Sequence, residues 1–190
     1  MFKHVNLGLS LSIGAAVLMP QVSVAQTAEL TAEEIAERLK NQKTRGLVLA
    51  PSNKTETTST NEAVETETLA QQNYVELAPD EQVSVQISFD FDSSALRPDQ
   101  KPKLATLCQV IQTVDVEVFR IVGHTDSSGS ASYNERLSLL RAQEVKRHLE
   151  GDCGIAPNRL EAVGVGEAFP LDKQDPRGDV NRRVEFQALS

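Results

Sequence analysis

The sequence predicts an α/β fold for residues 83–190, with helices packed on one face of a mixed four-stranded sheet. Residues 83–91 alternate between apolar and polar side chains, which is the period of a strand with one apolar face. Apolar residues then recur at helical spacing in two segments, 98–111 and 132–150. The other strands are predicted from β-branched runs at 116–123, 160–165 and 183–189. The resulting order, β-α-β-α-β-β, is that of an α/β sandwich.

Residues 1–25 have the pattern of a secretory signal peptide. Lys3 precedes an apolar stretch at 7–18, and small residues end the segment at Ala25. The apolar stretch is too short for a membrane-spanning helix, and no cysteine follows it that could carry a lipid anchor. We therefore expect export to the periplasm, no direct transmembrane segment, and outer-membrane association only through a partner.

Residues 26–50 predict a short amphipathic helix followed by an apolar patch. Thr31 and Glu34 form a capping-box pattern, and Ile35 and Leu39 lie four residues apart, which favours a helix from Ala32 to about residue 42. The patch at 47–49 follows. Residues 32–49 could dock on the C-terminal domain or on another envelope protein.

Residues 51–82 predict a disordered linker. The stretch is rich in Thr and Glu and poor in large apolar side chains, so its burial cannot offset the loss of chain entropy. The whole chain has a net charge of −8, which argues against a nucleic-acid-binding protein. An acidic chain also suits an anionic membrane surface poorly.

Two opposite charges are predicted to meet at one end of the sheet. Asp126 follows the apolar run 116–123, and Arg141 lies on the apolar stripe of the helix 132–150, with its side chain leaning toward the helix N-terminus. A guanidinium keeps its charge and needs a partner when it is buried. Either the two residues form a structural ion pair, or they clamp a ligand that carries both an ammonium and a carboxylate group.

The residues around this pair resemble those of the OmpA-like C-terminal domain family. The resemblance is carried by ISFDFDSSALRPDQ, GHTDSSGSASYNERLSLLRAQEVKRHL, NRLEAVGVGEAFP and NRRVEF, in order and at the family's spacing. It implies a periplasmic module that binds peptidoglycan non-covalently through diaminopimelate of the stem peptide, with no cofactor and no metal. Asp126 and Arg141 match the family's ligand-holding residues.

The same resemblance implies further contacts at Asn134, Asn181, Arg182 and Ser94. Asn134 could instead cap the helix locally. Because Arg182 and Arg183 alternate across a strand, only one can face the ligand, and the resemblance favours Arg182. Arg183 is then expected to be solvated or to lie between strands.

Cys108 and Cys153 are an even pair in a chain expected to reach an oxidising compartment, so we predict a disulfide. The alternative is that Cys108 is a free core residue. His124, two residues before Asp126, is more typical of a structural strand-end histidine than of a metal ligand or an acid-base group.

Three classes of function remain open from the sequence. The favoured hypothesis is a cell-wall-binding module without catalytic activity that contributes to envelope integrity. A wall-degrading enzyme lacks support, because no paired carboxylates or activated nucleophile are evident. The third is a protein-interaction or chaperone-like module in which Asp126 and Arg141 form a purely structural pair.

Overall fold

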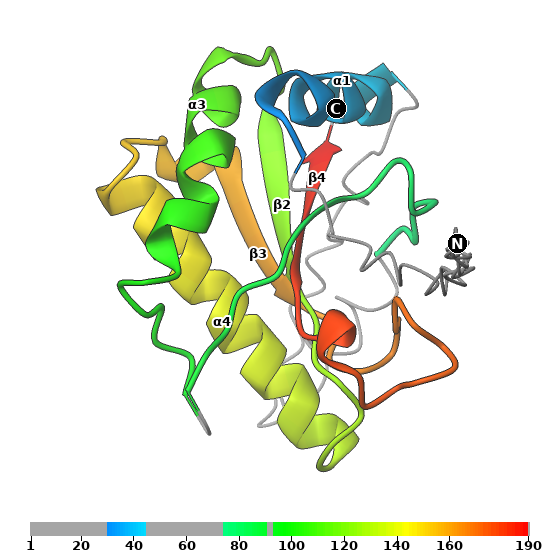
Figure 1. Cartoon of the computed structure of the whole chain (residues 1–190). Coiled ribbons are helices and arrows are strands. Elements are labelled where there is room, and N and C mark those ends of the chain that lie inside the picture. The colour runs from blue at the N-terminus through cyan, green and yellow to red at the C-terminus, as the bar shows by residue number, and fades with distance from the viewer. Residues whose placement is uncertain (1–29, 45–73, 91–92, 190) are drawn as a thin grey trace, which may run out of the picture.

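The structure is a computed structural model and describes residues 30–44, 74–90 and 93–189. Its centre is a four-stranded sheet with the order β1-β4-β2-β3 (Figure 1). The strands are β1 (Val83–Val85), β2 (Val118–Gly123), β3 (Leu160–Gly164) and β4 (Val184–Leu189). Strand β4 is antiparallel to both β1 and β2, whereas β2 and β3 are parallel. The mixed sheet confirms the predicted fold class.

The helices supply the apolar side chains that cover one face of this sheet. They are α1 (Ala32–Thr44), α3 (Ala105–Thr113) and α4 (Ala131–Gly151), and short 3-10 turns lie at Lys101–Leu104, Pro157–Arg159 and Asp179–Asn181. Leu107, Val145 and Leu149 from the helices and Phe119 and Phe186 from the strands share one core cluster. The helical stripe predicted from the sequence therefore faces the sheet.

Two predicted elements differ in extent from the structure. Strand β1 covers three residues rather than 83–91, because Val85 pairs with Val184, the first residue of β4, and no strand lies opposite the residues that follow. In this part of the chain a side chain replaces the strand as hydrogen-bond partner of the backbone: Gln100 Oε1 accepts from Ser88 N at 3.1 Å. The helix expected at 98–111 starts as a 3-10 turn with a proline near its beginning, and regular α-helix begins at Ala105.

Helix α1 packs on the domain. Thr31 and Glu34 make the predicted reciprocal capping bonds, with Thr31 N donating to Glu34 Oε2 at 2.8 Å and Glu34 N to Thr31 Oγ1 at 3.3 Å. Ile35 and Leu39 are buried in the main core. Gln42 accepts from Ala188 N at 2.8 Å, beyond the part of β4 that β1 covers. Of the two docking alternatives, contact with the C-terminal domain is present through the apolar side of α1. A protein partner for residues 32–49 stays a prediction, and residues 45–49 lie outside the described residues.

The second face of the sheet is covered by the segment 74–82 and by the chain after β3. Tyr74 packs with Val122 and Val165, and Leu77 packs with Leu189. This corrects the boundary of the linker expected at 51–82, since its last nine residues contact the domain, and residues 51–73 lie outside the described residues. Composition was misleading here because two buried apolar side chains, together with hydrogen bonds from Gln42 to Glu81 O and from Gln187 to Val75 O, hold the segment on the domain.

Two glycines allow α4 to approach the sheet closely. Gly123 of β2 and Gly164 of β3 are paired across the parallel strands. A Cβ at Gly123 would lie 2.1 Å from Ser138 O, and one at Gly164 would lie 2.4 Å from Leu139 N. Ser138 Oγ also accepts from Gly166 N at 2.9 Å. The middle of α4 is therefore fixed against the ends of two strands.

Cys108 and Cys153 form the predicted disulfide, with an S–S distance of 2.01 Å. Among the described residues, His148 joins these two cysteines in the one group with metal-ligand spacing, but both sulfurs are committed to each other. The bond ties α3 to the chain after α4. Within 30–44, 74–90 and 93–189, no helix is both long and apolar enough to cross a membrane.

Candidate ligand-binding site

Asp126 is held in the loop after β2 by the backbone on either side of it. His124 N donates to Arg183 O at 3.0 Å and Thr125 N to Gly166 O at 2.9 Å, so the loop leaves the sheet in one direction. The carboxylate is largely buried, and Oδ1 accepts from Ser128 N at 2.8 Å. Burial alone would raise the pKa of Asp126, but hydrogen bonds from Ser128 and Arg182 outweigh it and lower the pKa. Asp126 is therefore a preformed, ionised acceptor.

Gly129 has φ +101°, which allows the loop to turn between Asp126 and α4. The helix then starts with Ser130 as N-cap, whose side chain accepts from Tyr133 N at 3.3 Å. The turn at Gly129 sets the direction in which α4 carries Arg141.

Arg141 is largely buried but does not pair with Asp126. Its guanidinium lies 4.6 Å from the centre of the Phe89 ring, and Nε donates to Ser93 O at 3.3 Å. No ion pair of Arg141 is found within the described part of the chain. Burial lowers the pKa of Arg141, and the charge of Asp126 acts in the opposite direction. The alternative of a structural Asp126–Arg141 ion pair is therefore wrong for this structure.

Arg182 is the partner of Asp126 instead. Its Nη1 donates to Asp126 Oδ2 at 2.8 Å, and it also pairs with Asp179. The hydrogen bond to Asp126 raises the pKa of Arg182. Arg183, the residue before β4, is buried and lies against the segment 74–82 and the loop 169–173, away from Asp126, so the expected alternation holds, although Arg183 is not solvated.

Asn134 and Asn181 are buried and already bonded. Asn134 Nδ2 donates to Asp126 O at 3.2 Å and also to Glu167. Asn181 Oδ1 accepts from Asp172 N at 2.9 Å, and its Nδ2 donates to Asp175 O at 2.8 Å. Both side chains brace the loops around the site. Ser94 is partly exposed and follows Ser93, whose carbonyl oxygen accepts the hydrogen bond from Arg141.

A model of the OmpA family matches residues 88–183. The chain belongs to the OmpA family. The match includes Asp126, Arg141 and Arg182, and it leaves α1 and the segment 74–82 outside.

Two relatives of this OmpA-family chain are named as outer-membrane proteins. It is 40% identical over 105 residues to outer membrane porin F of Pseudomonas fluorescens, covering 54% of this chain and 32% of that protein. It is 40% identical over 103 residues to outer membrane protein A of Bordetella avium, covering 53% of each. The chain thus spans about a third and about half of the length of these two relatives.

A solved structure supports the fold over most of the chain. The crystal structure of a putative MotB-like protein from Desulfovibrio vulgaris is similar with a TM-score of 0.51 and 24% identity. The similarity covers 84% of this chain and 96% of that one. At this identity the comparison speaks for the fold alone.

The OmpA-like site contains two groups that the sequence pattern did not identify. Phe89, assigned from its alternation to the apolar face of a long strand, contacts the Arg141 guanidinium because the chain leaves the sheet after Val85. The second group is Glu167, whose carboxylate accepts a hydrogen bond from the side-chain amide of Asn134. In the sequence, the only indication of a role for Glu167 was the neighbouring glycine, Gly166. Its φ of +56° brings this loop against the start of α4.

Proposed function

We propose that this chain is an exported OmpA-like protein that binds peptidoglycan without cleaving it. Diaminopimelate of the stem peptide is the group recognised, with Asp126 accepting from its ammonium and Arg141 binding its carboxylate. The family resemblance supports the ligand class. The observation that carries the residue assignment is the Arg141 guanidinium, which is largely buried and has no ion pair among the described residues.

The electrostatics fit a ligand with both charges at one carbon. Arg141 presents a planar fork suited to a carboxylate, and an uncompensated guanidinium gains most from a charged acceptor. The Asp126 carboxylate has about four acceptor positions, and Ser128 and Arg182 occupy two of them. An ammonium can therefore be accepted while Arg182 keeps the carboxylate in place.

A non-catalytic role suits the chemistry of these residues. The pKa of Asp126 is lowered, which makes it a poor proton donor near neutral pH, and a general acid needs the opposite shift. Arg141 retains its charge at any ordinary pH and cannot act as a base. Both groups are suited to holding a ligand.

Co-sedimentation with purified sacculi tests the proposal. Asp126→Asn and Arg141→Lys should each weaken binding by about tenfold or more, because charge-assisted and bidentate hydrogen bonds are lost. Arg147→Gln is the matched control for Arg141, since it lies on the same helix with its side chain 75% exposed. Asp115→Asn is the control for Asp126, because that carboxylate is fully exposed. Circular dichroism melts establish that each variant is folded.

No sedimentation of the native chain with sacculi would favour the protein-interaction alternative, and undiminished binding by both folded site variants would place the wall contact outside Asp126 and Arg141. Release of soluble fragments from sacculi above a buffer blank would favour an enzyme. The location is part of the proposal as well, since residues 1–25 lie outside the described residues; a mature N-terminus at Gln26 in the periplasmic fraction is the expected result.

A further inference from the structure

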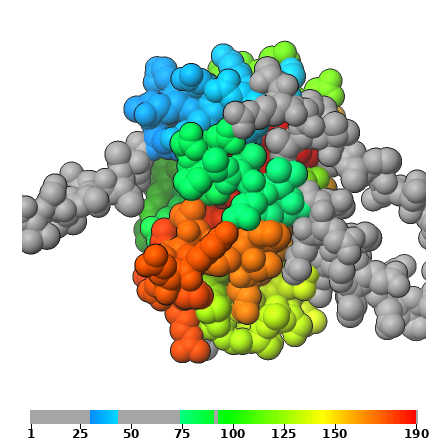
Figure 2. All heavy atoms as spheres, turned by 90° about the vertical axis from the view of Figure 1, so that its right-hand side faces the viewer, coloured from blue at the N-terminus to red at the C-terminus, as the bar shows by residue number. Residues whose placement is uncertain are grey.

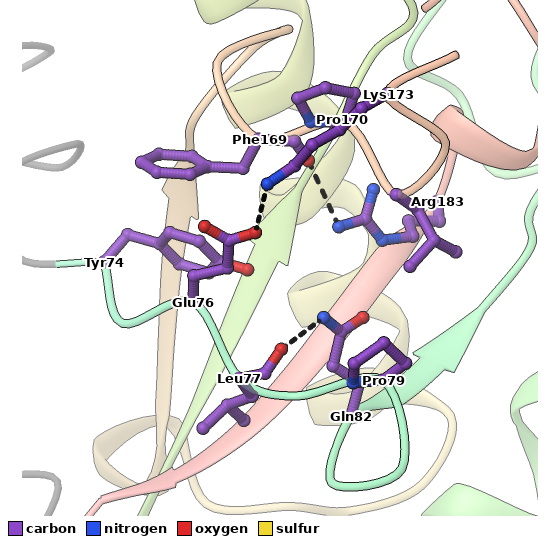
Figure 3. A pocket seen from close by; sticks show the side chains of 10 residues that line it. Tyr74, Glu76, Leu77, Pro79, Gln82, Phe169, Pro170, Lys173 and Arg183 are labelled. Carbon is purple, nitrogen blue, oxygen red and sulfur yellow. Dashed lines mark hydrogen bonds and ion pairs between the residues drawn. The ribbon is translucent and has the colours of Figure 1, made fainter. Parts of the chain in front are cut away.

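A small pocket lies on the face of the sheet opposite the helices. It has a volume of about 230 Å³ and lies between the segment 74–82, the loop 169–173 and Arg183, just before β4 (Figure 3). Figure 2 shows the chain on either side of residue 80 lying against the loop that follows β3. The pocket thus exists because the segment docks there, outside the part of the chain that matches the OmpA family.

Arg183 is the buried charged residue in the lining of this pocket. It is 5% exposed, and Nη2 donates to Phe169 O at 3.3 Å. Its Nε and Nη1 are buried and make no hydrogen bond within the described part of the chain. Figure 3 shows the guanidinium extending from the chain just before β4 toward Phe169 and Pro170. A buried guanidinium with unused donors is costly unless an acceptor reaches it.

The neighbouring carboxylate does not fill this role. Glu185 Oε2 lies 3.8 Å from Arg183 Nη2, beyond hydrogen-bond distance. Glu185 is engaged elsewhere, accepting from Tyr74 Oη at 2.9 Å and from Gln187 Nε2 at 2.9 Å. His124 Nε2 is 3.4 Å from the same carboxylate. Nε of Arg183, and the second N–H of Nη2 on the same edge of the guanidinium, therefore remain for another acceptor.

The rim and walls of the pocket indicate what that is. Lys173 and Glu76 pair at 3.2 Å across the rim, where both side chains are largely exposed, so they contribute little net charge. The apolar wall residues are Leu77, Pro79, Phe169, Pro170 and Leu171. A pocket with Arg183 as its buried positive group and with largely apolar walls suits a ligand that has a single negative charge and an apolar body.

We propose that this pocket binds a small monocarboxylate with a short apolar side group, its two oxygens accepting side-on from Nε of Arg183 and from the N–H of Nη2 on the same edge of the guanidinium. A carboxylate matches the planar fork of a guanidinium in two parallel hydrogen bonds. A phosphate dianion would bring a second charge close to Glu185 and Glu76, and Lys173, the other cation that lines the pocket, is already paired with Glu76. The site is independent of the peptidoglycan proposal, because Arg182 and Arg183 face opposite sides of the chain.

Isovalerate and its neutral isostere isovaleramide test this proposal with the full chain at pH 7.5. The readout is the ¹H–¹⁵N signal of the Arg183 Nε–H. Isovalerate should shift that signal saturably, and isovaleramide should bind about tenfold or more weakly because it lacks the charge. Inorganic phosphate should not displace isovalerate.

Two variants separate binding from folding. Arg183→Gln should abolish the isovalerate response but leaves Glu185 without its nearest cation, so its fold is checked by a thermal melt. Glu76→Gln removes a repulsive charge from the exposed rim without touching Arg183, and it should tighten isovalerate binding by about twofold or more.

Three results would overturn the proposal. One is equal binding of the amide and the carboxylate, and another is no saturable shift in either the native chain or Glu76→Gln, which would make Arg183 a purely structural charge. The third is a response that disappears in Arg141→Gln, which would place isovalerate in the Asp126 site. Retention of the response in Arg141→Gln distinguishes failure of this proposal from failure of the peptidoglycan proposal.

Discussion

Asp126 interacts with two arginines in different ways. Arg182 donates to its carboxylate directly, whereas Arg141 influences it through space and is held by Phe89 and Ser93. One arginine thus positions the acid, and the other stays available to an incoming carboxylate. This division explains how two opposite charges can lie near one another without neutralising each other in the free protein.

His124 makes the stability of the domain depend on pH. Burial lowers the pKa of His124, and the nearby Arg183 adds to the shift, while Glu185 opposes it. The folded state therefore keeps His124 neutral, whereas the unfolded chain takes up a proton below about pH 6.5. As the pH falls from 7 to 5.5, the free energy of unfolding should decrease by up to about 1.4 kcal/mol per pH unit.

Urea unfolding at pH 7.5, 6.5 and 5.5 measures this effect. His124→Gln should flatten the dependence in that range, and His148→Gln, at the other end of the domain, should retain it. The lowered pKa values of Asp126 and Glu185 also reduce stability in acid, but only as the pH falls below about 4.5. An unchanged slope in His124→Gln would show that His124 is not the group responsible.

At the scale of elements, the paired glycines set the height of α4 above the sheet. Gly164→Ala places a methyl group against the α4 backbone, and it should cost about 1–3 kcal/mol in unfolding free energy and weaken sacculus binding, because Arg141 moves with the helix. Gly151→Ala is the matched control, since no atom lies within 4 Å of its added Cβ. Chemical denaturation together with co-sedimentation distinguishes the two. A stable, fully binding Gly164→Ala protein would contradict this role.

Helix α1 is expected to unfold together with the sheet. Leu39 is fully buried against the core, so Leu39→Ala should lower the free energy of unfolding by about 2–5 kcal/mol in a single transition. Lys40→Ala, at the next and exposed position, should have little effect. Two separate unfolding transitions, or no loss of stability in Leu39→Ala, would show that α1 is not part of the cooperative unit.

At the scale of the whole molecule, the disulfide links Cys108 in α3 to Cys153 after α4, two residues that are 45 positions apart in the sequence. In the chain-entropy model, a closed loop of this size stabilises the fold by about 4 kcal/mol. The double variant Cys108→Ser/Cys153→Ser should therefore melt at a lower temperature than the oxidised protein, as measured by calorimetry. Equal melting temperatures would mean that the reduced, unfolded chain is already restricted.

Local patterns predicted the fold well and long-range contacts poorly. The strand and helix periods gave the correct order because each element buries a face that its own spacing reveals. The short β1 could not be foreseen, since it depends on where β4 begins, about a hundred residues away. Tyr74 and Leu77 were assigned to a linker because their few apolar contacts lie far along the chain.

The same distinction applies to the candidate site. Asp126 and Arg141 were found from a strand end and a helical stripe, which are local signals. The choice of Arg182 over Arg141 as the partner of Asp126 depends on the geometry of the Asp179–Asn181 turn, which spacing does not encode. The ligand contacts themselves stay a prediction.

A titration of the full chain with meso-diaminopimelate tests the central claim most directly. The account predicts that the Nε–H signal of Arg141 and the backbone signal of Asp126 shift together with one affinity, and that lysine, which lacks the second carboxylate and its centre, binds more weakly. Cadaverine, with two ammonium groups and no carboxylate, should shift neither signal. Shifts confined to other residues, or an Arg141 signal that does not respond at saturating diaminopimelate, would contradict the account.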